Sequence, residues 1–143
     1  MPSVTRKSDS QDLHDKWVRA IAKDRFAYPD DQHRTWETHT NPSSDKNVGI
    51  VLQNGSVVYP DIVVRDTAKP AGRDDVVMVG EVETAESVVD TELSQWRDYS
   101  ECAFYLYVPK GFCETARKLA EGVAINGFRE YWVENEKKRY KAC

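Results

Sequence analysis

The sequence has few cysteines and no long apolar run, and each deficit narrows the classes of protein that it can encode. The three cysteines, Cys102, Cys113 and Cys143, are an odd number without C-x-x-C spacing, so we expect free thiols in a reducing cytoplasm. No apolar run approaches the roughly 18 residues that a membrane helix needs, and residues 1–10 lack the apolar segment of a signal peptide. The sequence therefore predicts a soluble cytoplasmic protein with no membrane partner.

An excess of positive charge is also missing. The 20 Lys and Arg residues are outnumbered by 24 Asp and Glu residues, which gives a net charge of −4 and an isoelectric point near 5.4. A general electrostatic attraction to nucleic acid is therefore absent, and a nucleic-acid enzyme of this composition needs a local basic patch or a metal ion. No cysteine or second histidine stands at zinc-ligand spacing, so no zinc site is predicted.

The sequence does contain enough apolar material for one folded domain. Hydrophobic residues make up 40% of the 143 positions, with four Trp and seven Tyr, which suits a single core over residues 1–143. Neither an internal repeat nor a low-complexity linker interrupts the chain. We expect a flexible arm at residues 1–9 and a charged tail at residues 134–143 to lie outside the core.

Hydrophobic periodicity and turn residues divide the chain into helices and strands. The polar stretch 28–47 is long for a connector, so we expect either a short edge strand around Trp36 or a functional flap. The Asn-Gly pair at 54–55 predicts a type I′ turn in a hairpin, and Ser87 with Asp90 is typical of a capping box. The expected elements are a helix over 10–26, strands over 48–52, 57–64 and 76–83, a helix over 87–102, a strand over 103–108, a helix over 112–121 and a strand over 128–133.

This order, αβββαβ followed by αβ, predicts an α/β fold in which a mixed β-sheet is flanked by helices. The strand over 103–108 is apolar almost throughout, which is typical of a strand covered on both faces. The order of elements does not name a function by itself.

Three carboxylates are predicted to converge on the central strands. Because side chains alternate along a strand, Asp61 shares a face with Val63, and Glu81 and Glu83 share a face with Val79. If the two strands are neighbours, the three acids meet. Like charges so close together oppose ionisation, and a divalent cation removes that cost; oxygen ligands suit Mg²⁺ or Mn²⁺.

A plainer interpretation of the same residues is also open. Glu81 and Glu83 can line the solvent face of a half-exposed strand, where alternating polar residues are common. Asp61, which follows Pro60, can be an ordinary residue at the end of a strand.

The combination of Pro60-Asp61 with Glu81-Val82-Glu83 resembles the signature of the PD-(D/E)XK nuclease superfamily. The order of helices and strands is similar to the common core of that family over about residues 10–110. The resemblance implies a restriction-endonuclease-like core and a metal-dependent hydrolysis of phosphodiester bonds.

The helix that follows carries a second match. Gln95 and Tyr99 form a Q-x-x-x-Y motif that resembles the one found in RecB-like members of the superfamily. The two residues are four apart and lie on one helix face. The resemblance implies that they bind the DNA backbone or orient the acids, while simple packing of the helix on the sheet is the alternative.

The resemblance also assigns roles to the acids. Asp61 and Glu81 would be ligands of Mg²⁺ or Mn²⁺, with the carbonyl of Val82 as a third ligand. The family usually has lysine where this chain has Glu83. Some restriction enzymes of the superfamily carry glutamate there and remain active, so Glu83 can act as general base or as ligand of a second metal. Equally, the departure can mark a member that has lost catalysis.

Basic residues are the candidates for contacts with phosphate. Arg65, Lys69 and Arg73 stand in the loop between two expected strands, and Arg97 and Lys110 are the candidates for a cation that replaces the missing lysine. A solvated loop is the alternative for the first three.

The histidines carry weaker expectations. His14 lies on the first helix, where polar residues join the site in relatives, but a solvated or capping role is favoured. His33 and His39 flank Trp36, and a surface loop is favoured over contacts with phosphate or metal.

Two functions from different classes therefore stand at this point. The first is a Mg²⁺-dependent endo- or exodeoxyribonuclease, with nucleic acid, DNA first, as its partner. The second is a catalytically inactive member of the fold that binds nucleic acid or a protein partner. The small size of the chain adds the expectation of a homodimer or of a subunit within a larger assembly.

Overall fold

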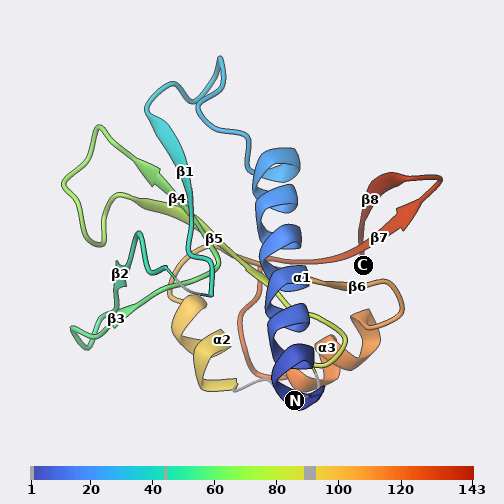
Figure 1. Cartoon of the computed structure of the whole chain (residues 1–143). Coiled ribbons are helices and arrows are strands. Elements are labelled where there is room, and N and C mark those ends of the chain that lie inside the picture. The colour runs from blue at the N-terminus through green and yellow to red at the C-terminus, as the bar shows by residue number, and fades with distance from the viewer. Residues whose placement is uncertain (1, 44, 89–92) are drawn as a thin grey trace.

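The computed structural model describes residues 2–43, 45–88 and 93–143, with side chains from residue 11 onward, and has a mixed α/β architecture (Figure 1). Three helices and eight strands form within these ranges. The helices are α1 (Pro2–Arg25), α2 (Leu93–Tyr99) and α3 (Cys113–Leu119); the strands are β1 (Trp36–Thr40), β2 (Ile50–Val51), β3 (Val57–Val58), β4 (Ile62–Asp66), β5 (Val76–Val82), β6 (Phe104–Pro109), β7 (Gly127–Glu134) and β8 (Lys137–Ala142).

A curled six-stranded sheet organises the molecule, with the strand order β1-β4-β5-β6-β7-β8. The first three strands form an antiparallel meander, β5, β6 and β7 run parallel, and β8 returns antiparallel to β7. The expected mixed sheet flanked by helices is confirmed at this level. The short hairpin of β2 and β3 forms a separate two-stranded sheet.

Two apolar cores lie on the two faces of the sheet. On one face α1 packs through Val18 and Ile21 against the sheet residues Ile62 and Tyr107, and Figure 1 shows this helix crossing the sheet. On the other face the β2–β3 hairpin, α2 and α3 cover the sheet, and a fully buried Trp96 lies in that core. The alternation of side chains along β5 and β6 therefore serves both cores, as the apolar sequence of β6 predicts.

The expected strand over 57–64 is wrong as a single element. It is interrupted at Tyr59 and Pro60, so β3 belongs to the small hairpin and β4 to the main sheet. Proline has no N–H to donate to a ladder, which is why it interrupts a central strand. Asp61 therefore lies just before β4 and not midway along a strand.

The type I′ turn occurs in a different hairpin from the expected one. At the β2–β3 turn only Gly55 has a positive φ, +87°, and its N–H bonds the carbonyl of Leu52, as in a type I turn followed by a left-handed residue. At the β7–β8 turn both Asn135 and Glu136 have positive φ, 50° and 64°. This two-residue connection has the backbone signs of a type I′ turn.

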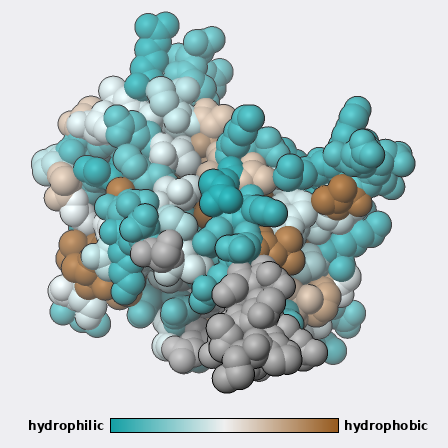
Figure 2. Space-filling model, viewed as in Figure 1, coloured by the Kyte–Doolittle hydropathy of each residue, from teal (hydrophilic) through white to brown (hydrophobic). Residues whose placement is uncertain are grey.

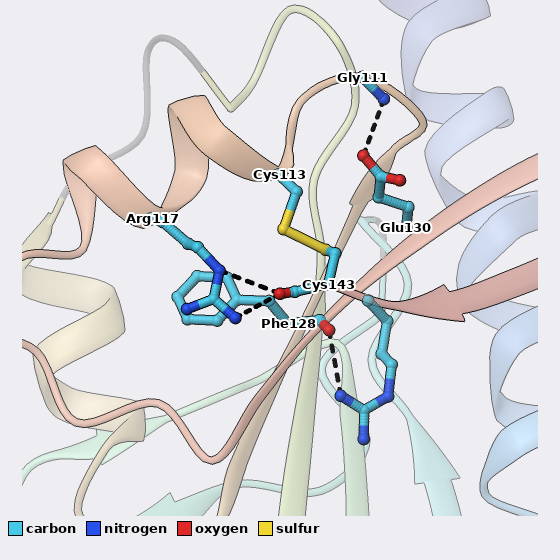
Figure 3. Close-up of a disulfide and its surroundings, with 7 residues drawn as sticks. Gly111, Cys113, Arg117, Phe128, Glu130 and Cys143 are labelled. Carbon is cyan, nitrogen blue, oxygen red and sulfur yellow. Dashed lines mark hydrogen bonds between the residues drawn. A yellow bond between two sulfur atoms is a disulfide. The ribbon is translucent and has the colours of Figure 1, made fainter.

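The charged C-terminal segment is a strand, so the prediction of a tail over 134–143 is wrong. Residues 137–142 pair with β7, and a disulfide joins Cys113 on α3 to Cys143 (Figure 3). Arg117 donates hydrogen bonds to the Cys143 carbonyl beside it. The prediction of free thiols is therefore wrong for these two cysteines, while Cys102 is free. Disulfides are uncommon in reducing compartments, so the cytoplasmic location stays a prediction that this bond does not favour.

The remaining elements agree with expectation to different degrees. The edge strand around Trp36 is confirmed as β1, which pairs only with β4 in the described sheet. The first helix starts at Pro2 and not near Ser10. The described part of the second helix is Leu93–Tyr99, and Asp90 of the expected capping box lies outside the described residues. Within the described chain, no helix is both long and apolar enough to cross a membrane.

Candidate acidic site at the ends of the central strands

The structure brings Asp61, Glu81 and Glu83 to one end of two neighbouring strands. β4 and β5 are antiparallel with Ile62 opposite Gly80, so Asp61 at the start of one strand lies beside Glu81 near the end of the other. The Asp61 N–H donates to Glu81 Oε1 at 3.1 Å, and the N–H of Val82 donates to Asp61 Oδ2 at 2.8 Å. The expected adjacency of the two strands and of their carboxylates is present.

All three carboxylates are buried, with exposed fractions of 9% for Asp61, 7% for Glu81 and 5% for Glu83. The alternative that the two glutamates line a solvent face is therefore wrong. Burial raises the pKa of Glu81 well above its ordinary value, and the negative charges of Asp61 and Glu83 raise it further. Without a cation, Glu81 holds a proton that an exposed glutamate would lose.

His14 supplies positive charge to this site from α1. Its Nε2 lies 3.1 Å from Asp61 Oδ2 and its Nδ1 lies 3.1 Å from Asp15 Oδ1, so the ring stands between two carboxylates. Burial lowers the pKa of His14, but the hydrogen bonds and charges of Asp61 and Asp15 outweigh it and raise that pKa to about 9. His14 is therefore an imidazolium at neutral pH, and the prediction of a solvated or capping histidine is wrong.

Asn41, which sequence reasoning passed over, holds the backbone on which Asp61 stands. Its side chain makes four hydrogen bonds: its amide donates to the carbonyls of Val48 and Pro60, and its oxygen accepts from the N–H groups of Asn47 and Val48. Its own N–H donates to the carbonyl of Asp61 at 2.9 Å. A buried amide with every partner satisfied is a strong local constraint. No local pattern marks it, because its partners lie up to 20 residues away.

Glu83 is held by donors from the segment before α2 and from α2 itself. Ser87 Oγ donates to its Oε2 at 2.6 Å, and Trp96 Nε1 donates to its Oε1 at 3.3 Å. Its backbone carbonyl accepts the Tyr131 hydroxyl at 2.7 Å. Both carboxylate oxygens therefore accept hydrogen bonds from residues of this region, and the role of Glu83 as general base or metal ligand stays a prediction.

The two residues of the Q-x-x-x-Y motif lie differently. Tyr99 is buried against Phe104, and burial together with the charges of Glu81, Asp61 and Glu83 raises its pKa. The phenol therefore stays protonated close to the acids. Gln95 is exposed on α2. Packing accounts for Tyr99, and the proposed roles of both residues in catalysis stay predictions.

The five basic residues expected to contact phosphate are dispersed. Arg65 is bound to buried Asp75 at 2.6 Å, so its charge is already neutralised. It is four residues along β4 from Asp61, or roughly 13 Å, and the loop with Lys69 and Arg73 lies beyond it. Arg97 is exposed on α2. These positions do not form one patch around the acids.

Lys110 follows β6 at the same end of the sheet as the acids, because β5 and β6 are parallel. Its Nζ lies over the Trp132 ring at 4.9 Å from the centroid. The other two histidines are engaged locally: His33 stacks on Trp36, and His39 lies 3.3 Å from Glu37.

The acids suit a hard cation by chemistry, although no preformed cage exists. Among the described residues, no group of three or more His, Cys, Asp or Glu side chains is arranged so that it could hold a metal ion. Mg²⁺, however, is commonly bound by one or two carboxylates together with waters and substrate phosphates. Asp61 and Glu81 provide two buried carboxyl groups whose joint ionisation requires a nearby positive charge.

Comparisons with protein-family models, with curated proteins and with solved structures found no significant match to this chain.

Proposed function

We propose that this protein is a metal-dependent nuclease that hydrolyses phosphodiester bonds, with DNA as the first substrate to test. The observation that supports it best is the adjacency of buried Asp61 and Glu81 at the ends of β4 and β5, joined by the 3.1 Å bond between the Asp61 N–H and the Glu81 carboxylate. Two acids so placed oppose ionisation unless a cation lies between them.

The topology around these acids supports the same proposal. The antiparallel meander of β1, β4 and β5 is followed by α2 and then by β6, which is parallel to β5. That succession is the one that the resemblance to PD-(D/E)XK nucleases implies. The restriction-endonuclease-like core is therefore part of this proposal.

Within this site each residue has a distinct role. The carboxylates of Asp61 and Glu81, with the carbonyl of Val82, would hold Mg²⁺ or Mn²⁺. A bound ion of this kind lowers the pKa of a coordinated water and neutralises charge on a phosphate. His14 orients Asp61 through the 3.1 Å contact, and Glu83 is held in place by the segment leading into α2.

Cleavage assays with Mg²⁺ and Mn²⁺ on panels of single- and double-stranded DNA and RNA test the proposal. Asp61→Ala and Glu81→Ala are expected to abolish metal-dependent cleavage, because each removes one of the two carboxylates. Asp74→Ala, at an exposed acid in the β4–β5 loop, is the matched control and is expected to cleave normally. Unchanged cleavage in the first two variants would exclude this site.

A second function is favoured by one observation. Glu83 stands where the family has lysine, and both of its carboxylate oxygens accept hydrogen bonds from the α2 side. A chain that binds nucleic acid or a protein partner without cutting fits this arrangement. Mn²⁺ titration separates the two functions, since binding that is lost in Asp61→Ala supports the nuclease. No binding at millimolar Mn²⁺ supports the inactive module. Light scattering tests the expected homodimer in either case.

A further inference from the structure

A cavity lies on the face of the sheet that α1 covers. It has a volume of about 370 Å³, within the range of small-molecule sites. Its walls come from the end of α1, from β5, β6 and β7, and from the last residue of β8. Figure 1 shows the β7–β8 hairpin projecting beside α1, and Figure 2 shows the hydrophilic end of this hairpin standing away from the body of the molecule.

Two guanidinium groups, from Arg25 and Arg129, line this cavity, and none of its lining residues is acidic. In the part of the chain that the structure describes, neither arginine forms an ion pair; the nearby Asp24 accepts the Tyr140 hydroxyl at 2.7 Å. Arg25 lies over the Tyr140 ring at 5.1 Å and Arg129 over the Tyr105 ring at 5.7 Å. A protein of net charge −4 thus concentrates two uncompensated cations here.

Both cations line the same cavity as Tyr107. Burial raises the pKa of Tyr107, while the charges of Arg129 and Arg25 lower it in part, so both guanidinium groups lie within electrostatic reach of the same hydroxyl. Planar guanidinium groups bind phosphate through paired hydrogen bonds. An anion placed near the Tyr107 hydroxyl would therefore meet donors from α1 and from β7.

Aromatic rings form the rest of the lining. Tyr28, Tyr105, Tyr107 and Phe26 contribute to it, together with the apolar side chains of Met78 and Ala142. Aromatic rings beside arginine are the arrangement on which proteins stack bases while they hold the backbone phosphate. A simple inorganic anion would use only the arginines, and an uncharged apolar ligand would leave both arginine charges without a counterion.

We infer that this cavity binds a nucleoside monophosphate, either free or as the terminal nucleotide of a strand, with its phosphate on Arg25 and Arg129 and its base against the tyrosines. The inference does not depend on the proposed nuclease function, because neither Asp61 nor Glu81 is among the residues that line the cavity.

Titration of the intact protein with adenosine 5′-monophosphate, followed by amide chemical shifts and calorimetry, tests this inference. We expect saturable binding with shifts in the amides of β6 and β7. Arg25→Gln and Arg129→Gln are each expected to weaken it about 10-fold or more, as the loss of a hydrogen bond to a charged group does. Arg19→Gln, at an exposed arginine of the same helix, is the matched control and should bind as the unchanged protein does.

Further arms separate the possible sources of the ligand. Adenosine and inorganic phosphate, used alone, are each expected to bind at least 10-fold more weakly than the nucleotide. A 5′-phosphorylated oligonucleotide that binds more tightly than the mononucleotide identifies a strand end as the ligand. If the mononucleotide shifts no amide of β6 or β7, or if Arg25→Gln and Arg129→Gln bind it unchanged, the inference is overturned. Asp61→Ala should retain binding, which keeps this result separate from any loss of nuclease activity.

Discussion

Two regions of the molecule, the acidic site and the cavity, carry charge of opposite sign and handle it differently. In the acidic site three buried carboxylates accept hydrogen bonds from within the chain, and one imidazolium, His14, contributes the nearby positive charge. In the cavity Arg25 and Arg129 line an open space without a carboxylate among its walls. The fold supplies hydrogen-bond donors and one cation to the acids, and it supplies no carboxylate to the walls around the two arginines.

Because of this difference, the two regions respond to different components of the solution. Bringing like charges together in a buried setting is unfavourable unless a proton or a counterion intervenes, so the acidic site responds to pH and to cations. Exposed Arg25 and half-buried Arg129 have no carboxylate beside them in the cavity wall, so the cavity responds to the concentration of an anionic ligand. Four substitutions test one region or the other, and the largest expected effect comes first.

Trp96→Ala is expected to have the largest effect, a loss of stability around the acidic site. The side chain is fully buried and its Nε1 donates to Glu83, so its loss should lower the free energy of unfolding by about 3–5 kcal/mol. Urea unfolding followed by circular dichroism measures this. Trp132→Ala, at a half-buried tryptophan of β7, should cost less. Equal losses in the two variants would contradict the central place given to Trp96.

Cys143→Ser is expected to loosen the wall of the basic cavity. The disulfide closes a loop with a sequence separation of 30, and its removal should lower the free energy of unfolding by about 3–4 kcal/mol. Because Ala142 lines the cavity, nucleotide binding should weaken as well. The control is Cys102→Ser at the free cysteine. A Cys143→Ser protein as stable as the unchanged chain under oxidising conditions would show that the bond contributes nothing.

His14→Gln is expected to flatten the pH dependence of stability on the acidic side. Folding raises the pKa of His14 from 6.5 to about 9, so the folded state holds the proton more tightly than the unfolded chain. The resulting stabilisation is complete below pH 6.5 and is lost as the pH rises through about 9. It is of the order of 3 kcal/mol.

Urea unfolding at intervals between pH 6 and pH 9.5 measures this change. The unchanged protein should lose stability across that range, and His14→Gln should lose much less of it. His39→Gln, at a histidine beside Glu37 on β1, serves as the control. A His14→Gln curve parallel to that of the unchanged protein would show that the imidazolium of His14 does not stabilise the acidic site.

Glu136→Gly is expected to have the smallest effect and to raise stability. Glu136 has φ = 64°, a region that costs an L-residue about 1 kcal/mol and costs glycine nothing. Thermal unfolding should show a gain of about that size. Asn135→Gly should gain less, since asparagine tolerates this region. A loss of stability in Glu136→Gly would argue against the type I′ turn of the β7–β8 hairpin.

Much of the fold could be predicted because its signals are local. The apolar run of β6, the helix α3 and the strand that carries Glu81 each lie close to the expected ranges. The interruption at Pro60 also had a local signal, the missing N–H of proline, which the expected strand ignored. β8 had none, because Lys137–Ala142 has little apolar periodicity and its position depends on pairing with β7 and on the disulfide.

The residues of the candidate site likewise differ in whether a local signal predicts them. The meeting of Asp61 and Glu81 follows from strand alternation and from adjacent strands, and it could be predicted. The contact of His14 with Asp61 spans 47 residues and depends on how α1 crosses the sheet. The arginines of the cavity come from α1 and β7, which approach each other only in three dimensions. Such contacts cannot be predicted from strand alternation and strand adjacency.

The hydrogen bonds of Asn41 have a consequence for how relatives of this chain should be recognised. The side-chain amide of Asn41, which lies outside every acidic motif, donates to the carbonyl of Pro60 directly before Asp61, and its backbone N–H donates to the carbonyl of Asp61. A variant that kept both carboxylates but replaced Asn41 would retain the acidic motif, and yet it would lose the four side-chain hydrogen bonds that fix the backbone before Asp61. Asparagine at this position, together with the acidic residues, is therefore a better criterion for an assembled site than the acidic residues alone.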